Sequence, residues 1–166
     1  MDLDNMGLYA GWVLSTENDY LFALGSTLDL DEAAGMLYRV GIDTARGYLN
    51  GGFQSWKEAG KRTASLPVYS AEKVQAELSS GDLQLLDVRQ PHETQGDSIQ
   101  GSTFSPLTSI FTGVSSMNPD VPIAAICPSG IRSTTGASIL QHAGYKLAGI
   151  TDIGLKEWKR RGLQTS

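Results

Sequence analysis

The sequence contains one cysteine, Cys127, two histidines and no long apolar run. A single cysteine excludes an internal disulfide framework and is typical of a reducing compartment, so we expect a cytoplasmic protein. The longest apolar runs are far too short to cross a bilayer, so we expect no membrane as a partner. The histidines and the cysteine lie far apart in the sequence and show no recognisable metal-ligand spacing.

Basic residues are in the minority, with 13 lysines and arginines against 18 aspartates and glutamates, and the formal net charge is −5. This balance argues against nucleic acid as a partner. Four basic residues gather near the end of the sequence, at Lys156, Lys159, Arg160 and Arg161. We interpret them as a solvated helix face that complements the helix dipole, not as a binding patch.

The most informative stretch surrounds the cysteine. Ile123 to Ile126 is a short apolar run between prolines, which predicts a strand buried on both faces. From Ser133 the apolar spacing predicts a helix that ends at Gly144. Cys127 therefore lies in a tight loop between a buried strand and the start of a helix.

A thiol in this loop should ionise more easily than a free one. Backbone N–H groups and the helix dipole converge on such a loop, and Arg132 adds a permanent positive charge. Gly130 lets the backbone curl without a Cβ clash. A thiolate here would be a nucleophile. The alternative is a buried, inert cysteine at a strand end.

Three segments carry motifs. Leu85-Leu-Asp-Val-Arg-Gln-Pro-His-Glu93 contains D-V-R-x-x-x-E, and Cys127-Pro-Ser-Gly-Ile-Arg-Ser133 has the form C-x-x-G-x-R-S. Gly154-Leu-Lys-Glu-Trp-Lys-Arg-Arg-Gly162 has the form G-x-x-x-W-x-x-x-G. In type and order the three resemble the motifs of rhodanese-like sulfurtransferases, over about Val68 to the end. Alternating strand and helix patterns also predict an α/β fold, with a mainly parallel sheet and helices on both faces.

The resemblance implies a sulfurtransferase without metal or organic cofactor. Cys127 would take a sulfane sulfur from a small sulfur-containing anion such as thiosulfate, or from a thiol persulfide, hold it as a persulfide and pass it to a nucleophilic acceptor. The loop that would bind the sulfur comprises Pro128, Ser129, Gly130, Ile131, Arg132 and Ser133. The supporting residues would be Asp87, Arg89 and Glu93.

Several roles stay open. Arg132 would bind an anionic donor or steady the loop, and Arg89 would pair with Asp87 and reach Glu93 or the loop, or else touch substrate. Only Arg132 among the loop residues is charged, which favours a persulfide over thiosulfate. His92, in a polar turn, is expected to be solvated and not a base.

Two other functions are possible. A cysteine phosphatase also uses a Cys…Arg loop at a helix start, but with five intervening residues, and only four separate Cys127 from Arg132. Rhodanese-like domains can also be non-catalytic binding or regulatory modules. Rhodanese-like domains of this non-catalytic kind lack the cysteine. Cys127, Gly130 and Arg132 are all present here.

The first part of the sequence repeats the order of the last part. Gly52, Trp56 and Gly60 have the spacing of Gly154, Trp158 and Gly162. We therefore expect residues 1–66 to be an incomplete, inactive rhodanese-like unit and residues 67–166 a complete catalytic domain. When the helix-end glycines Gly41 and Gly144 are aligned, Leu24 stands opposite Cys127, so the first unit has no nucleophile.

A half-domain leaves sheet edge and apolar surface uncovered. We expect this chain to be the tail of a longer protein, resembling persulfide dioxygenase-like proteins in which a metallo-β-lactamase-like domain precedes rhodanese domains. A homodimer would be another way to cover the surface.

The element boundaries can also be predicted. In the first unit we expect a buried strand over Tyr20–Leu24, a loop over 25–29, a helix over Leu30–Val40, a strand over Arg46–Leu49 and a linker over Lys61–Pro67, with Leu8–Leu14 either helix or strand. In the second we expect a helix over Tyr69–Leu78 capped by Ser70, strands over Leu83–Val88 and Ile99–Phe104, and a helix starting within Pro106–Ile110.

Overall fold

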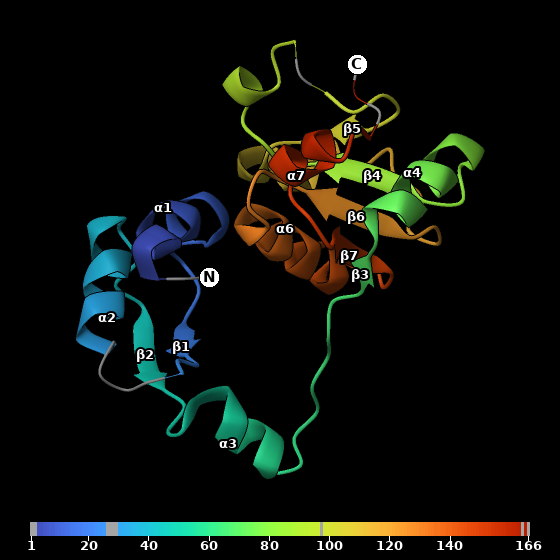
Figure 1. Cartoon of the computed structure of the whole chain (residues 1–166). Coiled ribbons are helices and arrows are strands. Elements are labelled where there is room, and N and C mark those ends of the chain that lie inside the picture. Colours follow the sequence, from blue (N-terminus) through green and yellow to red (C-terminus); the bar gives the residue numbers. More distant parts are fainter. Residues whose placement is uncertain (1–2, 26–29, 97, 164, 166) are drawn as a thin grey trace. The chain divides into compact units, whose positions relative to one another are not determined.

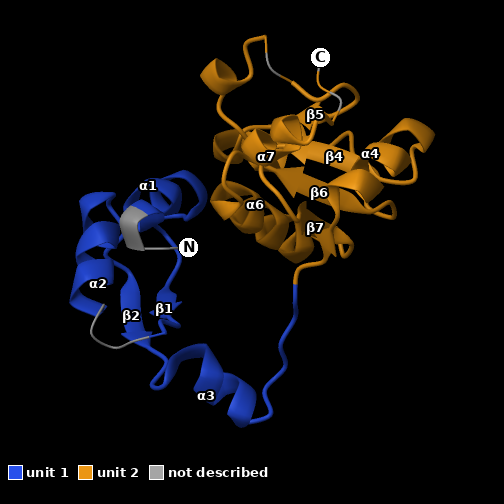
Figure 2. Cartoon of the chain, in the orientation of Figure 1, with its two compact units in different colours: residues 1–65 blue, residues 66–166 orange. Residues whose placement is uncertain are grey.

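The computed structural model describes residues 3–25, 30–96, 98–163 and 165. The chain divides into two compact units, residues 1–65 and 66–166 (Figure 2). The boundary falls inside the predicted linker, which contains neither helix nor strand between residues 61 and 67. Within the described ranges, no helix has both the length and the apolar character needed to cross a membrane.

The second unit alternates strands and helices along most of its length (Figure 1). With η marking a 3-10 turn, its elements are β3 (Val68–Tyr69), α4 (Ala71–Ser80), β4 (Gln84–Asp87), η2 (Pro91–Glu93), β5 (Thr103–Phe104), η3 (Leu107–Ser109), α5 (Ile110–Gly113), β6 (Ile123–Ile126), α6 (Ile131–His142), β7 (Ala148–Thr151) and α7 (Leu155–Arg160). The five strands form one sheet in the order β3-β7-β6-β4-β5, and every neighbouring pair is parallel. The predicted parallel α/β fold is confirmed.

Helices cover both faces of this sheet. Because side chains alternate along a strand, Leu85 and Leu86 of β4 point to opposite faces. Leu85 packs in a cluster with residues of α4 and α7, including Val74 and Trp158. On the other face Gly136 of α6 lies against η3 and α5, and its missing side chain allows that close approach. The four residues of β6 are all buried, as a central strand covered on both faces requires.

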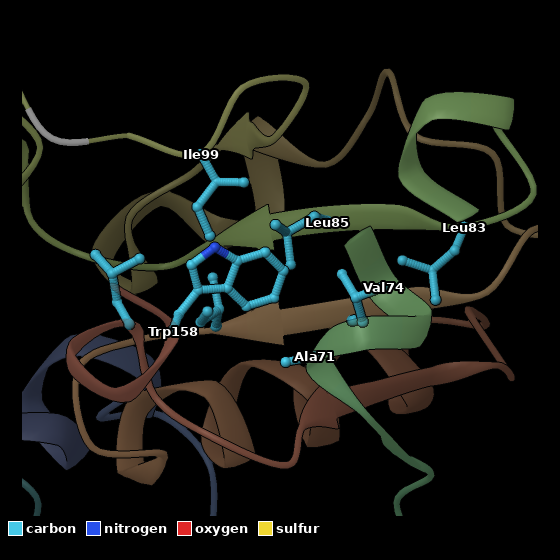
Figure 3. Packing of buried hydrophobic residues seen from close by; sticks show 9 residues of the cluster. Ala71, Val74, Leu83, Leu85, Ile99 and Trp158 are labelled. Atoms are coloured by element: carbon cyan, nitrogen blue, oxygen red, sulfur yellow. The ribbon is translucent and has the colours of Figure 1, made fainter. Parts of the chain in front are cut away.

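The core of the second unit surrounds Trp158, whose side chain is fully buried (Figure 3). Burying an aromatic side chain of this size removes about 150–250 Å² from water, which is worth on the order of 4–6 kcal/mol. Trp158 packs with Ala71, Leu85 and Ile99, which come from three separate segments of the chain. It therefore fixes α7 against the sheet, with one end of the helix next to the loop that follows β6.

Local signals explain most helix ends. The Ser70 side chain accepts a hydrogen bond from the Lys73 amide, as predicted, and Gly81 ends α4 with a positive φ of 81°. Gly144, the predicted stop of α6, also has a positive φ. Two helices were misplaced by two residues. α4 spans Ala71–Ser80 where Tyr69–Leu78 was predicted, and α6 begins at Ile131, before the predicted start at Ser133, because Gly130 already supplies its N-cap.

Two strands of the second unit escaped sequence analysis. β3 and β7 are short and pair with each other at one side of the sheet. The predicted strand over Ile99–Phe104 shrinks to the two residues of β5, since the Ser102 amide instead closes a turn onto the Ile99 carbonyl.

The first unit contains α1 (Leu3–Val13), β1 (Tyr20–Phe22), α2 (Leu30–Arg39), β2 (Ala45–Tyr48) and α3 (Gly52–Glu58). The undecided segment Leu8–Leu14 is therefore mostly helical. The β1 and β2 strands pair in parallel, and Ala10, Leu37 and Ile42 form a small core beside them. Most of the predicted loop over 25–29 lies outside the described residues.

The prediction of a buried strand over Tyr20–Leu24 was wrong. β1 spans only three residues, and Leu21 at its centre is 74% exposed. The reason is that the small core lies against one face of β1: Tyr20 and Phe22 pack on it, whereas Leu21 points to the opposite face. Apolar composition alone does not reveal which face of a strand is covered.

Candidate active site

Cys127 directly follows β6, where the chain turns into α6. This is the carboxyl end of a parallel sheet, the usual position of ligand sites in such folds. The residue is fully buried. Gly130, with φ 92°, is the N-cap of α6, and this left-handed conformation curls the loop back over the sulfur.

Three groups surround the Cys127 sulfur. The backbone amides of Gly130 and Ser133 donate hydrogen bonds to Sγ at 3.1 and 3.4 Å. The thiol lies 3.6 Å from the Ser133 hydroxyl oxygen, and that hydroxyl donates to the carbonyl of Gly130 at 2.9 Å. The site thus places two backbone N–H donors at the N-terminus of a twelve-residue helix around one sulfur, an arrangement typical of anion-binding loops.

Arg132 forms an ion pair with Glu93. Its two terminal nitrogens donate to the two Glu93 carboxylate oxygens at 2.5 and 2.8 Å. These hydrogen bonds are the main reason that the pKa of Glu93 falls from its ordinary 4.5 to about 2. The backbone amide of Gln90 donates to the same carboxylate and acts in the same direction. In this arrangement Arg132 steadies the loop, one of the two roles expected of it.

A buried ion pair lies behind Glu93. Arg89 donates from Nε and Nη2 to the Asp87 carboxylate at 2.7–3.0 Å, and both side chains are 2–3% exposed. Nη1 of Arg89 donates to the carbonyl of Glu93 at 2.9 Å. Of the two roles considered for Arg89, this geometry fits the ion pair with Asp87. The pair links the end of β4, through the η2 turn and Glu93, to Arg132.

The other residues considered in the sequence analysis differ in their burial. Pro128 is half-buried and Ser129 is exposed, while Ile131 is half-buried in the first turn of α6. The His92 side chain is exposed on η2, as expected of a solvated histidine. The structure thus brings together the loop, Asp87, Arg89 and Glu93, which lie up to about 46 residues apart in the sequence.

A cleft of about 390 Å³ lies beside the loop. Sequence analysis did not predict two of the residues that line it. The lining consists of Arg89, Glu93, Pro128, Leu155, Lys156 and Lys159. Lys156 and Lys159 are exposed, as expected of a solvated helix face, but they also line the cleft. Sheet topology could have revealed it: β6 and β7 are parallel neighbours, so α7, which follows β7, begins at the same edge as Cys127.

Comparison with known proteins gives one family. The model of the rhodanese-like domain matches residues 70–161. Two relatives come from Bacillus subtilis (strain 168): "Putative sulfur carrier protein YrkF" is 28% identical over 103 residues, and the uncharacterised protein YqhL is 33% identical over 79 residues. These alignments cover 61% and 45% of this chain, and 56% and 60% of the relatives, so the chain spans little more than half of their length.

Solved structures agree on the fold. A rhodanese-related protein from Thermoplasma volcanium aligns with a TM-score of 0.52 at 24% identity, over 60% of this chain and 96% of its own. A thiosulfate sulfurtransferase from Pseudomonas aeruginosa aligns with a TM-score of 0.52 at 22% identity. That second alignment covers 100% of this chain but 36% of the other, and therefore includes both units.

Proposed function

Since this chain belongs to the rhodanese-like family, we propose that it is a sulfurtransferase, which moves a sulfane sulfur from a donor to a nucleophilic acceptor through a persulfide on Cys127. The Cys127 thiolate attacks the outer sulfur of the donor. A sulfur–sulfur bond forms at Sγ, the sulfur–sulfur bond of the donor breaks, and the donor leaves with the electron pair of that bond, as sulfite from thiosulfate or as a thiolate from a persulfide. The acceptor then takes the outer sulfur and releases the Cys127 thiolate.

One observation carries this proposal: the two amides that point at Sγ. The Gly130 and Ser133 amides already donate to the sulfur, so they are in place for the thiolate before transfer. A persulfide anion is one sulfur longer and needs donors around the same loop. The curl at Gly130 provides a small concave site whose N–H groups face one point.

The test is sulfur loading followed by mass spectrometry. Wild-type protein incubated with thiosulfate or glutathione persulfide should gain the mass of one sulfur atom, and cyanide should remove it as thiocyanate. The matched control is Cys127→Ser, which keeps the loop and the size of the side chain but loses the soft nucleophile. Equal loading of Cys127→Ser would overturn the proposal.

The orientation of Arg132 argues against the phosphatase alternative. A phosphatase loop needs its arginine to bind a phosphate held above the cysteine. Here the two terminal nitrogens of Arg132 are directed to Glu93, and the loop is one residue shorter than that chemistry uses. The presence of Cys127 under two amides likewise favours catalysis over a purely binding role.

We propose further that residues 1–66 are an incomplete and inactive copy of the same fold. The order β1, α2, β2, α3 repeats the order β6, α6, β7, α7, and both strand pairs are parallel. A Cβ on Gly52 would collide with the carbonyl of Leu24, as one on Gly154 would collide with the carbonyl of Pro128. This shared contact aligns Leu24 with Pro128 and puts Ala23, one residue from the sequence-based choice, opposite Cys127. Neither Ala23 nor Leu24 is a nucleophile.

A further inference from the structure

The wall of the cleft is built on α7, and a backbone contact joins that helix to the cysteine loop. The Leu155 amide donates to the carbonyl of Cys127 at 3.1 Å. Lys156 follows directly, and Lys159 lies three residues further along the same helix, so the two side chains share a face. Pro128 lines the cleft from the other side, one residue from the nucleophile.

Lys156 and Lys159 bring positive charge to the cleft. Among the described residues that line it, the other charged groups are Arg89 and Glu93, and each is engaged in an ion pair, with Asp87 and Arg132. Lys156 and Lys159 are exposed on the wall. A concave site with positive charge on a chain of net charge −5 attracts anions locally.

The other basic residues of α7 behave differently. Arg160 and Arg161 both donate to the Glu157 carboxylate, and Arg161 also reaches Glu72. Neither arginine lines the cleft. Lys156 and Lys159 therefore line the cleft, whereas Arg160 and Arg161 do not.

The size of the cleft indicates the kind of anion. Its volume of about 390 Å³ is much larger than a compact inorganic anion needs, and it lies within the range of about 300–1,000 Å³ typical of sites for organic molecules. Leu155 and Pro128 add apolar surface between the lysines and the loop. A suitable ligand would place its reactive end at Cys127 and negative groups some distance away.

We propose that Lys156 and Lys159 determine donor specificity, by binding the carboxylates of an organic thiol persulfide whose sulfane sulfur is directed at Cys127. This inference rests on the proposed function and assigns the donor class to the same site. Lysine acts as a mobile point charge, so the pair suits carboxylates of variable position. The bound donor then loses its outer sulfur to the Cys127 thiolate and departs as the free thiolate, still carrying its carboxylates.

The experiment compares two persulfides that differ in charge. Glutathione persulfide carries carboxylates and 2-mercaptoethanol persulfide carries none, and the readout is the ratio of their kcat/KM values. In the double variant Lys156→Gln, Lys159→Gln this ratio should fall about tenfold, mainly through a higher KM for glutathione persulfide, because two ion pairs are lost. Raising the salt concentration should reduce the wild-type ratio in the same direction.

The matched control is Arg160→Gln, Arg161→Gln, which removes the same charge from the same helix outside the cleft. An equal fall of the ratio in this control would overturn the inference, since only the overall charge would then matter. An unchanged ratio in the lysine variant would also overturn it.

A second measurement separates this inference from the proposed function. Binding of the unreactive analogue S-methylglutathione to the Cys127→Ser protein should weaken in the background of the two lysine substitutions. If wild-type protein loads sulfur from both persulfides without preference, the specificity inference fails and the sulfurtransferase proposal stands. If no donor loads Cys127, both proposals fail.

Discussion

Both carboxylate oxygens of Glu93 accept hydrogen bonds from Arg132, 39 residues further along the chain. The Glu93 carbonyl also accepts one from Arg89, which is paired with Asp87. Glu93 therefore connects a rigid, buried ion pair to the loop of the nucleophile. We expect the position of the loop, and with it the rate of sulfur transfer, to depend on this residue.

Arg132→Lys should reduce sulfur transfer more than stability. A lysine cannot donate to both carboxylate oxygens in the way that the arginine does. The loss of one charged hydrogen bond should lower the free energy of unfolding by no more than about 3 kcal/mol. Displacement of the loop should lower the loading rate about tenfold or more. Denaturant unfolding and sulfur loading measure the two effects.

Arg160→Lys is the control for that substitution. Arg160 makes a two-pronged contact with Glu157, but its side chain is 77% exposed. Exposed pairs contribute little, so neither stability nor loading should change measurably. Similar effects in both variants would mean that the Arg132–Glu93 pair has no special role.

The lowered pKa of Glu93 predicts an acid dependence of stability. Because its pKa is about 2 in the folded protein and 4.5 ordinarily, ionised Glu93 stabilises the fold above pH 4.5. This contribution is lost as the pH falls from 4.5 toward 2. Urea unfolding of wild type and Glu93→Gln should differ most near neutral pH and converge in acid. A difference that stays constant with pH would contradict the assignment.

Glu157 provides a comparison for Glu93 within the same chain. The pKa of Glu157 is also lowered to about 2, by hydrogen bonds from Arg160 and Arg161, but its partner Arg160 is 77% exposed, against 12% for Arg132. Glu157→Gln should therefore give a smaller difference than Glu93→Gln, and moderate salt should remove most of it.

Ser133 and Thr134 allow a matched test of the sulfur environment. Both hydroxyls donate to the Gly130 carbonyl, at 2.9 and 2.8 Å, but only that of Ser133 lies against Cys127 Sγ. Ser133→Ala should slow sulfur loading by about 2- to 10-fold, the effect of one neutral hydrogen bond. Thr134→Ala should stay within about twofold of wild type. If Thr134→Ala slows loading as much, the hydroxyls act only through the carbonyl.

Gly154→Ala should disturb the loop from the opposite side. A Cβ there would collide with the carbonyl of Pro128, so α7 and the loop would have to move apart at a cost of about 1–3 kcal/mol. In contrast, Gly35 of α2 has open space around it, and Gly35→Ala should stabilise the first unit by roughly 0.5–1 kcal/mol. Thermal unfolding of both variants measures the difference. A stable, fully active Gly154→Ala protein would refute the close contact.

Two tryptophans that share the G-x-x-x-W-x-x-x-G spacing should contribute different amounts to stability. Trp158 is completely buried, whereas Trp56 is 41% exposed. Trp158→Ala should cost about 3–5 kcal/mol, and Trp56→Ala clearly less. Denaturant unfolding of the two variants is the measurement. Equal losses would imply that something covers Trp56 in solution.

Sequence patterns predicted the second unit well where local chemistry decides structure. The Ser70 cap, the stop at Gly144 and the buried strand over Ile123–Ile126 depend on neighbours in the sequence. Cys127 and Glu93 could likewise be identified from the residue spacing of their sequence motifs.

What could not be predicted depends on partners far along the chain. Leu21 looked like a core residue because its segment is apolar, yet it lies on the face of β1 opposite the small core. Lys156 looked like an ordinary solvated residue, since only the pairing of β6 with β7 brings the start of α7 to the cleft. Arg132 pairs with Glu93, which lies outside its own loop and 39 residues earlier in the chain, so the loop sequence alone could not reveal this contact.

The six-residue helix α7 has its two roles on different faces. Leu155 and Trp158 are buried and hold it in place, while Lys156 and Lys159 are exposed toward the cleft. Cys127 belongs to another element, the loop before α6. Under the proposed function, donor preference and sulfur transfer therefore depend on different elements: exchange of two surface side chains would change the preferred donor while the core and the cysteine loop stay untouched.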